Sequence, residues 1–589
     1  MDDVFLRYYE KELDDLRRAS KRFAAEFPKV AGRLQLGDGE CADPYVERLL
    51  EGVAFLTARI ARKMDDGQSE FPENLLNQIA PEYNAPVASR AILHIRPEEE
   101  VVSLPSGTVF EVPTTLPGKP VCRYALRDDI VFAGVDVLNT QYDEVLSVSA
   151  ARTYAGRTGV CRSVGGVKLT LRCRPAAGVR DVRFYTNMPE SAAGELQHAL
   201  LTRCCGVLVR CGDEEKLLPA EAVQEDLMGT AEPGLPPTAE YFLLPTQQGF
   251  ITVRGLRSVL PEKGEATLIF MLHRALPDRM RLLLQESPAL QTNCARVINA
   301  FERRLNRVVP SWRPAEHLVA DATATADYEV LRVYDGSVYT DENEKLFDIY
   351  PFYHASDVSM PLGTERLNYF SVHREQPVSP PKSRMSPYIG SEVYLQISGP
   401  DYSAHRESMG SLALRALCSN RDLPLFLRRD AALVSDKAEA RFVAGPTPPG
   451  DPLMCDAARW MGLVLARRTP TAMAAYDGDA LSAIVRLLLE HQHDAANVAA
   501  RRQVAGVEDV RLSSTTRAIP VHGDLCVARG WRWEILLNEK AYGDGGVFLF
   551  ARSLAAYLLS LSEINSFSEV SIRTTSQLLK TWYQQAPEA

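Results

Sequence analysis

The sequence lacks the short motifs that mark the common enzyme families. It contains no GxxxxGK[ST] phosphate-binding loop, no GxGxxG turn, no HExxH zinc motif and no GxSxG nucleophile elbow. Such motifs place backbone N–H groups, metal ligands or a nucleophile where the chemistry needs them. We therefore do not expect the chain to be an enzyme of these classes, and we expect no cofactor.

The chain also lacks long apolar runs, a basic stripe and paired cysteines. No apolar run approaches the ~18 residues that span a bilayer, and the start of the sequence carries the acidic residues Asp2 and Asp3 where a signal peptide would be basic. Lys and Arg are interleaved with Asp and Glu at a net charge of −10, which disfavours nucleic acid as a partner. Eleven cysteines without a CxxC pair resemble neither a disulfide framework nor a zinc site. These features predict a cytoplasmic protein that does not insert into a membrane.

A length of 589 residues with 46% hydrophobic and 24% charged residues is typical of several globular domains. Short apolar runs broken by Pro and Gly begin near residue 91, and the PTPPGDP stretch at residues 446–452 is the clearest linker. We predict an α+β multidomain fold with four parts. These are an N-terminal helical region at 1–90, a β-rich middle domain at 91–290, a second mixed β-rich domain at 291–445 and a C-terminal α/β domain at 453–589.

Helical periodicity is strongest near the N-terminus. Residues 4–27 carry an apolar stripe that includes Phe5, Tyr9, Leu13 and Leu16. A second helix should begin at Pro44, with Asp43 as its N-cap. Its apolar face must be buried against something, and consists of Val46, Leu49, Val53, Leu56 and Ile60. Further helices are predicted at 192–204, 293–308, 479–491 and 547–564.

Two groups of polar residues are weak candidates for chemistry. His491, His493 and Asp494 could hold a metal ion only if the preceding helix has already ended, because residues two apart on a helix point to different sides. The alternative is a solvated helix terminus with His near the negative end of the dipole. His522 and Asp524 could form an acid–base pair on a strand, but no nucleophile is implied nearby. The sequence favours neither function.

Several segments resemble one known family. They are FLRYYEKEL at residues 5–13, FPKVAGRL at 27–34, the stretch 43–89, CSNRDLPLFL at 418–427, VAGVEDV at 504–510, AYGDGGVFLFARSL at 541–554 and INSFSEV at 564–570. In this order they resemble the TssF family, also called ImpG or VasA, of the bacterial type VI secretion system. The resemblance implies a structural, non-catalytic baseplate subunit of a contractile injection system.

The resemblance also implies a set of partners. Two TssF copies would clasp one TssG to form a baseplate wedge, and TssK would attach the wedge to the inner-membrane complex. Six wedges would surround the spike, VgrG, from which the sheath, with its initiating subunit TssE, and the inner tube grow. A baseplate wedge protein of a contractile phage tail or tailocin is one alternative. An uncharacterised hydrolase built on His522 and Asp524 is a more distant one.

Apolar surface near both termini suggests where partners bind. The candidate interface with TssG or with a second TssF copy comprises Phe5, Tyr9, Leu13, Leu16, Asn565 and Phe567. The competing interpretation of the N-terminal stripe is that it packs on the second helix of the same chain.

Overall fold

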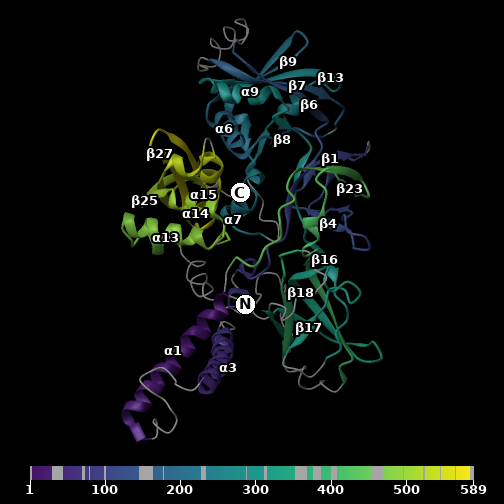
Figure 1. The fold of residues 1–589 in the computed structure, drawn as a ribbon. Helices are drawn as coiled ribbons and strands as arrows, with labels where there is room; N and C mark the ends of the chain where they lie inside the picture. Colours follow the sequence, from purple (N-terminus) through teal and green to yellow (C-terminus); the bar gives the residue numbers. More distant parts are fainter. Residues whose placement is uncertain are drawn as a thin grey trace. The chain divides into compact units, whose positions relative to one another are not determined.

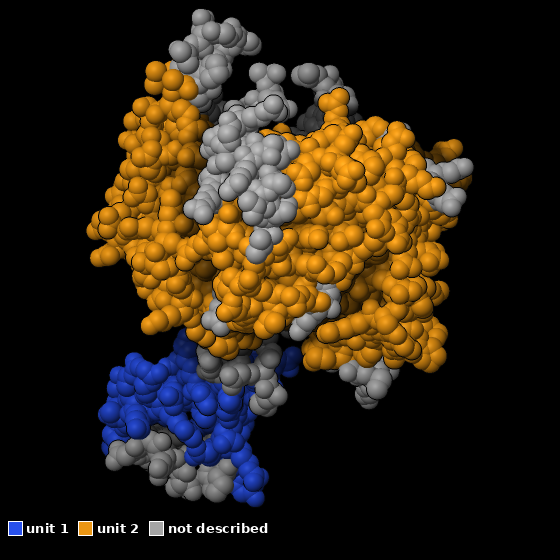
Figure 2. All heavy atoms as spheres, turned by 90° about the horizontal axis from the view of Figure 1, so that it is seen from above, with its two compact units in different colours: residues 1–79, 454–463 blue, residues 80–453, 464–589 orange. Residues whose placement is uncertain are grey.

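The structure is a computed structural model in which the chain forms two compact units. It describes residues 3–29, 44–68, 73, 75–77, 80–98, 101–144, 163–176, 178–226, 234–286, 288–310, 315–351, 368–375, 386–399, 408–453, 469–494, 496–521, 524–543, 546–563 and 566–583. Unit 1 comprises residues 1–79 and 454–463, and unit 2 comprises residues 80–453 and 464–589 (Figure 2).

Unit 1 contains a helical hairpin (Figure 1). Its two long helices are α1 (Asp3–Glu26) and α3 (Pro44–Gln68). Both helices were predicted, because each has an apolar stripe at helical spacing and α3 begins at a proline, which suits a first helical position. The expected N-cap, Asp43, lies outside the described residues.

A closed six-stranded barrel lies in unit 2, and its strands come from three distant parts of the sequence. In order around the barrel they are β1 (Arg90–Pro97), β15 (Cys294–Ile298), β4 (Cys122–Leu126), β3 (Val109–Val112), β23 (Ala432–Ser435) and β24 (Ala438–Ala444). Closure leaves no exposed sheet edge. The interior is packed with apolar side chains such as Leu93, Phe110 and Val297.

Two further sheets follow the first half of the barrel in sequence. The five-stranded sheet has the order β10 (Glu214–Pro219), β9 (Cys204–Cys211), β13 (Gly264–Leu272), β7 (Gly165–Cys173) and β6 (Val135–Asp143). The four-stranded sheet has the order β11 (Val223–Glu225), β12 (Phe250–Val253), β8 (Val182–Thr186) and β14 (Leu290–Gln291). Helices α6 (Glu190–Thr202) and α9 (Asp278–Glu286) contribute Leu196 and Met280 to the core that these sheets share.

Unit 2 also contains a short two-stranded sheet, short helices and 3-10 turns. Strands β2 (Ser103–Leu104) and β5 (Ile130–Val131) pair with each other. Helices α7 (Pro237–Leu243) and α8 (Leu256–Val259) and the 3-10 turns η1 (Pro81–Tyr83), η2 (Ala220–Ala222), η3 (Pro245–Gln248) and η5 (Leu423–Phe426) connect the strands.

A seven-stranded sheet forms the next layer of unit 2. Its order is β16 (Phe301–Arg304), β22 (Ser411–Ser419), β18 (Glu329–Tyr339), β19 (Lys345–Pro351), β20 (Asn368–Glu375), β21 (Glu392–Ser398) and β17 (Glu316–Leu318). Only β19 and β20 pair in parallel among these strands.

The C-terminal part combines helices with a four-stranded sheet. The sheet has the order β25 (Val507–Val521), β26 (Asp524–Leu537), β27 (Phe567–Thr574) and β28 (Leu578–Tyr583). Strands β26 and β27 are parallel, and α15 (Val547–Ser560) lies between them in the chain, as a crossover connection requires. Helices α12 (Pro470–Met473), α13 (Gly478–Glu490) and α14 (Val498–Ala505) and the turn η6 (Glu539–Ala541) complete this part. The predicted α+β multidomain fold class is confirmed.

The helix predicted at residues 293–308 is wrong. The segment instead forms β15 of the barrel and β16 of the seven-stranded sheet. All five residues of β15 are buried, including Arg296, which the helical pattern placed on a polar side. Buried ion pairs compensate the Arg296 charge, so a strand that is buried on both faces shows no alternation in the sequence.

Candidate functional site

The α1–α3 hairpin of unit 1 buries small side chains on α3. Ala54 and Ala58 are fully buried, and Glu47 on the same side accepts a 2.7 Å hydrogen bond from Arg17 of α1. At the N-terminal end of α1 the Phe5 ring meets the Phe55 ring edge-on at 5.2 Å. Small residues let two helices approach closely, so this side of α3 is the one that α1 covers.

The opposite side of α3 carries an exposed apolar row. Its members recur at helical spacing and are Tyr45, 80% exposed, Leu49, 67%, Leu56, 58%, and Ile60, 59%. We call these four residues the α3 row. Single exposed apolar residues are ordinary, but a continuous row over four helical turns is typical of an interaction surface. The sequence predicted that this face must be buried, and within the described chain it is not.

The residues proposed from the sequence as an interface have different surroundings. Phe5, Tyr9, Leu13 and Leu16 are half-buried on α1. Phe567 is only 9% exposed in β27, and Asn565 lies outside the described residues. The sequence analysis did not name the α3 row as a partner surface, although the helical spacing of Leu49, Leu56 and Ile60 indicated that one face of this helix is apolar.

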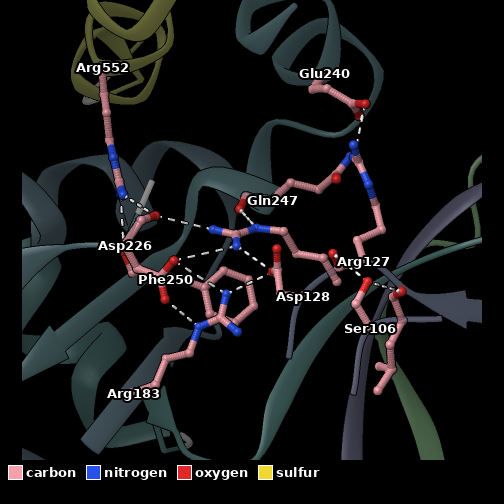
Figure 3. Close-up of polar contacts among 11 residues, drawn as sticks. Ser106, Arg127, Asp128, Arg183, Asp226, Glu240, Gln247, Phe250 and Arg552 are labelled. Carbon is pink, nitrogen blue, oxygen red and sulfur yellow. Dashed lines mark hydrogen bonds and ion pairs between the residues drawn. The ribbon is translucent and has the colours of Figure 1, made fainter. Parts of the chain in front are cut away.

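Unit 2 contains an extended ionic cluster (Figure 3). It consists of Arg90, Arg127, Asp128, Arg183, Glu225, Asp226, Glu240, Arg296 and Arg552. Figure 3 labels six of them, namely Arg127, Asp128, Arg183, Asp226, Glu240 and Arg552. Glu240 of α7 is fully buried. Its carboxylate oxygens lie 2.6 Å from Arg90 Nε and 2.9 Å from Arg127 Nη1. Burial would raise the pKa of Glu240, but the two guanidiniums outweigh it and lower the pKa below its usual value.

Asp128 and Asp226 form the centre of this cluster. Asp128 accepts hydrogen bonds from Arg296 at 2.6 Å and from Arg183 at 3.0 Å, and Arg183 also pairs with Asp226. Both guanidiniums lie 4.3 Å from the centre of the Phe250 ring. Burial acts to raise the pKa of Asp128, yet the two arginines hold it at about 2.

Arg552 connects α15 to the same cluster. This fully buried guanidinium donates to the carbonyl oxygens of Gln248 at 2.6 Å and Asp226 at 2.5 Å. On the neighbouring strand, Lys580 Nζ lies 2.6 Å from Glu225. The cluster therefore links the barrel, the four-stranded sheet and the C-terminal part of unit 2. Because arginines hold the Glu240 and Asp128 carboxylates in the ionised form, this arrangement suits a structural junction better than acid–base chemistry.

Of the residues considered for chemistry, the structure describes His491, His493 and Asp494. Helix α13 ends at Glu490, and His491 donates from Nδ1 to the Leu487 carbonyl at 2.7 Å, as expected for a helix terminus. His493 is buried, with its ring 5.1 Å from that of Phe242. Among the described residues, no group of three His, Cys, Asp or Glu side chains could hold a metal ion. His522 and the Asp524 side chain lie outside what the structure describes.

Unit 2 also has an open cleft of about 510 Å³. His94, Arg96, Asp136 and Arg174 contribute to its lining. The Arg174 guanidinium and the Asp136 carboxylate lie 2.5 Å apart, so the charged lining is partly paired within itself. Burial, together with the Arg96 charge, lowers the pKa of His94.

These features define a class of protein. The chain is multidomain, its ionised groups are organised into a structural cluster, and its most prominent surface is an exposed apolar helix row. Within the described ranges, no helix is long and apolar enough to cross a membrane. This is the character of a structural assembly subunit.

Comparisons with known proteins identify the family. The model of the TssF family of the type VI secretion system matches residues 1–589. The type VI secretion system component TssF1 of Pseudomonas aeruginosa strain PAO1 is 30% identical over 612 aligned residues, covering 98% of this chain and 97% of the relative. The chain belongs to the TssF family. Its members are structural subunits and not enzymes, as the sequence predicted.

Two solved structures share the fold. One is a chain of the TssK-TssF-TssG baseplate subcomplex of a type VI secretion system, with a TM-score of 0.66 and 18% identity, over 91% of this chain and 98% of that chain. The other is a chain of a type VI baseplate complex, with a TM-score of 0.57 and 19% identity, over 99% and 98%.

Proposed function

We propose that this chain is a baseplate wedge subunit that assembles with TssG and TssK. Family membership and the fold shared with a chain of the TssK-TssF-TssG subcomplex support the proposal. In the proposed wedge two copies of this chain bind one TssG. The wedge is cytoplasmic and docks on the inner-membrane complex. Six such wedges surround the spike, VgrG, and the sheath-initiating TssE joins them in the full baseplate.

The observation that carries the proposal is the α3 row. Burying a large apolar side chain stabilises a complex by roughly 1.5–3 kcal/mol, so four exposed side chains can supply a substantial part of a binding free energy. A third helix laid along the row would pack on the side of α3 opposite to α1, so that α3 would lie between two helices. We infer that this helix comes from TssG or from the second copy of the chain.

The α1 residues proposed from the sequence offer a separate surface of the hairpin. Phe5, Tyr9, Leu13 and Leu16 are half-buried, so each keeps some surface for a partner, on the side of the hairpin away from the α3 row. Tyr9→Asp is expected to weaken the complex with TssG. If the Tyr9→Asp chain folds and assembles normally, α1 has no part in the interface.

Leu56→Asp tests the α3 row directly. Because Leu56 is 58% exposed, the variant chain should fold with an unchanged circular dichroism spectrum. Co-expressed with TssG, it should no longer co-purify. The matched control is Ala25→Asp, which adds the same carboxylate to an exposed position of α1 and should leave co-purification intact. Equal recovery of both variants would contradict the proposal.

A further inference from the structure

The hairpin of β25 and β26 extends beyond the C-terminal sheet. The two strands pair along their whole length, from Val507 opposite Leu537 to Val521 opposite Asp524. Strand β27 pairs with β26 only from Gly530 onward. Residues 516–521 and 524–529 therefore form a two-stranded ribbon, about 20 Å long at 3.3 Å per residue, with no third strand among the described residues. We call it the ribbon.

One face of the ribbon continues the packed face of the sheet. Val510, Trp533 and Ile535 belong to the core that also contains Val485 of α13 and Leu554 of α15. Strand alternation and the unbroken register from residue 509 onward place Ala518 and Val527 on this same face, opposite each other.

This face is uncovered on the ribbon. Val527 is 76% exposed, and Thr516, Ala518 and Arg529 are exposed with it. Within the sheet the same face is covered by helices (Figure 1), and the Val510 N–H even donates to Ser482 Oγ of α13 at 2.8 Å. An isolated hairpin is marginally stable in water. Exposed apolar side chains on the ribbon therefore favour the binding of a partner that covers them.

The opposite face is braced at the root of the ribbon. The Arg517 guanidinium lies 5.0 Å from the Phe567 ring centre and 4.8 Å from that of Tyr583, and it pairs with Glu569 at 3.1 Å. Gly530 makes room for Phe567, because a Cβ there would lie 2.6 Å from the ring. These contacts of Arg517 fix the base of the ribbon to β27 and β28. They leave the face that carries Ala518 and Val527 uncovered.

We propose that the open face of the ribbon binds an amphipathic α-helix of a neighbouring subunit. The helix continues the layer formed by α13 and α15, with its apolar side on Ala518 and Val527. An acidic residue on its flank meets Arg529, since the described side chains of this face include a basic residue and no acidic one. At 5.4 Å per turn, the ribbon accommodates between three and four helical turns, by a rough estimate. This surface is separate from the α3 row and does not depend on it.

Site-specific photo-crosslinking in the native bacterium tests the proposal. A photoreactive residue replaces Val527 in the full chain, and a matched control replaces Ser513, which is exposed on the opposite face of the sheet. We expect Val527 to crosslink to residues of another subunit at helical spacing, identified by mass spectrometry, and Ser513 not to. No crosslink at Val527, or one to a strand or to a second copy of this chain, would overturn the proposal.

Two further measurements separate the alternatives. Hydrogen exchange should stay fast at the outward amides of β25 in the assembled complex, because a docked helix leaves the strand edge open, whereas an added strand would slow it. Val527→Asp should leave the melting temperature of the lone chain unchanged and weaken binding of the crosslinked subunit roughly tenfold. A parallel photoreactive residue at Leu56 reports on the α3 row, so failure at one position alone identifies which proposal fails.

Discussion

Glu240 carries one negative charge between the buried guanidiniums of Arg90 and Arg127. Desolvating three ionised groups is unfavourable, and close pairing with hydrogen bonds offsets that cost only while all three are present. Removing the carboxylate leaves two positive charges buried without compensation. Removing the Glu240 carboxylate should therefore lower the free energy of unfolding by more than removing the carboxylate of an exposed ion pair.

Glu240→Gln is expected to destabilise unit 2 by about 3–5 kcal/mol, measured as the shift of the urea unfolding transition. The matched control is Glu111→Gln, which removes the partner of Arg123 in a half-exposed ion pair and should cost less than about 1 kcal/mol. Similar shifts for the two variants would show that the buried cluster does not hold unit 2 together.

His198 should make the stability of unit 2 depend on pH. The ring is buried beside Phe548 at 4.9 Å between ring centres, and burial, with Arg203 nearby, lowers its pKa to about 4. In the unfolded chain the pKa is about 6.5. Because the pKa of His198 is lower in the folded chain than in the unfolded chain, protonation favours the unfolded chain. The stability of unit 2 that depends on His198 is therefore fully present above pH 6.5 and is lost as the pH falls toward 4.

Between pH 7 and pH 5 the His198 contribution should fall by about 2 kcal/mol. Urea unfolding of the wild type and of His198→Gln at both pH values measures it, because the variant lacks this titration while other groups titrate in both proteins. Parallel pH profiles for the two proteins would mean that His198 takes up its proton equally well when folded.

At the scale of elements, Phe567 and Arg517 fix the β25–β26 hairpin to β27. Phe567→Asp should therefore destabilise the C-terminal part of unit 2 by about 3–5 kcal/mol and speed hydrogen exchange at residues 516–521. Leu578→Asp on β28 is the control, because Leu578 is exposed and its change should have little effect. If Phe567→Asp folds as stably as the control, Phe567 acts at a partner surface, as the sequence analysis proposed.

The elements that could be predicted are those whose pattern is local. Helices α1, α3, α13 and α15 show an apolar period along a continuous segment, so their positions were predicted to within a few residues. The barrel was not predicted, since its pairings join β1 to β15 and to β24, some 200 and 350 residues away. Strand β15 was taken for part of a helix because Val297, Ile298, Phe301 and Leu305 recur at helical spacing.

The candidate site was predictable only in part, for a physical reason. The sequence identified both helices of the N-terminal hairpin, but packing decides which face is covered. Ala54 and Ala58 allow α1 to approach closely, and the larger Leu49 and Leu56 are left outside. The ionic cluster gave no signal, because charged residues far apart in a sequence indicate solvated surface until a structure brings them together.

In the molecule as a whole, contacts connect residues from the beginning of unit 2 with residues near its end. Arg90 of β1 and Arg552 of α15 belong to the same ionic cluster, and Trp582 donates its indole N–H to Glu225 at 2.9 Å. These contacts tie the N-terminal and C-terminal parts of unit 2 to each other. The exposed α3 row and the ribbon are the two surfaces that we propose for binding to neighbouring subunits.

The stoichiometry of this chain with TssG tests most directly whether it is a wedge subunit. The two proteins are co-expressed, purified together and weighed by light scattering. We expect a discrete complex with two copies of this chain for each TssG. A stable lone monomer that does not bind TssG would show that the chain is not a wedge subunit.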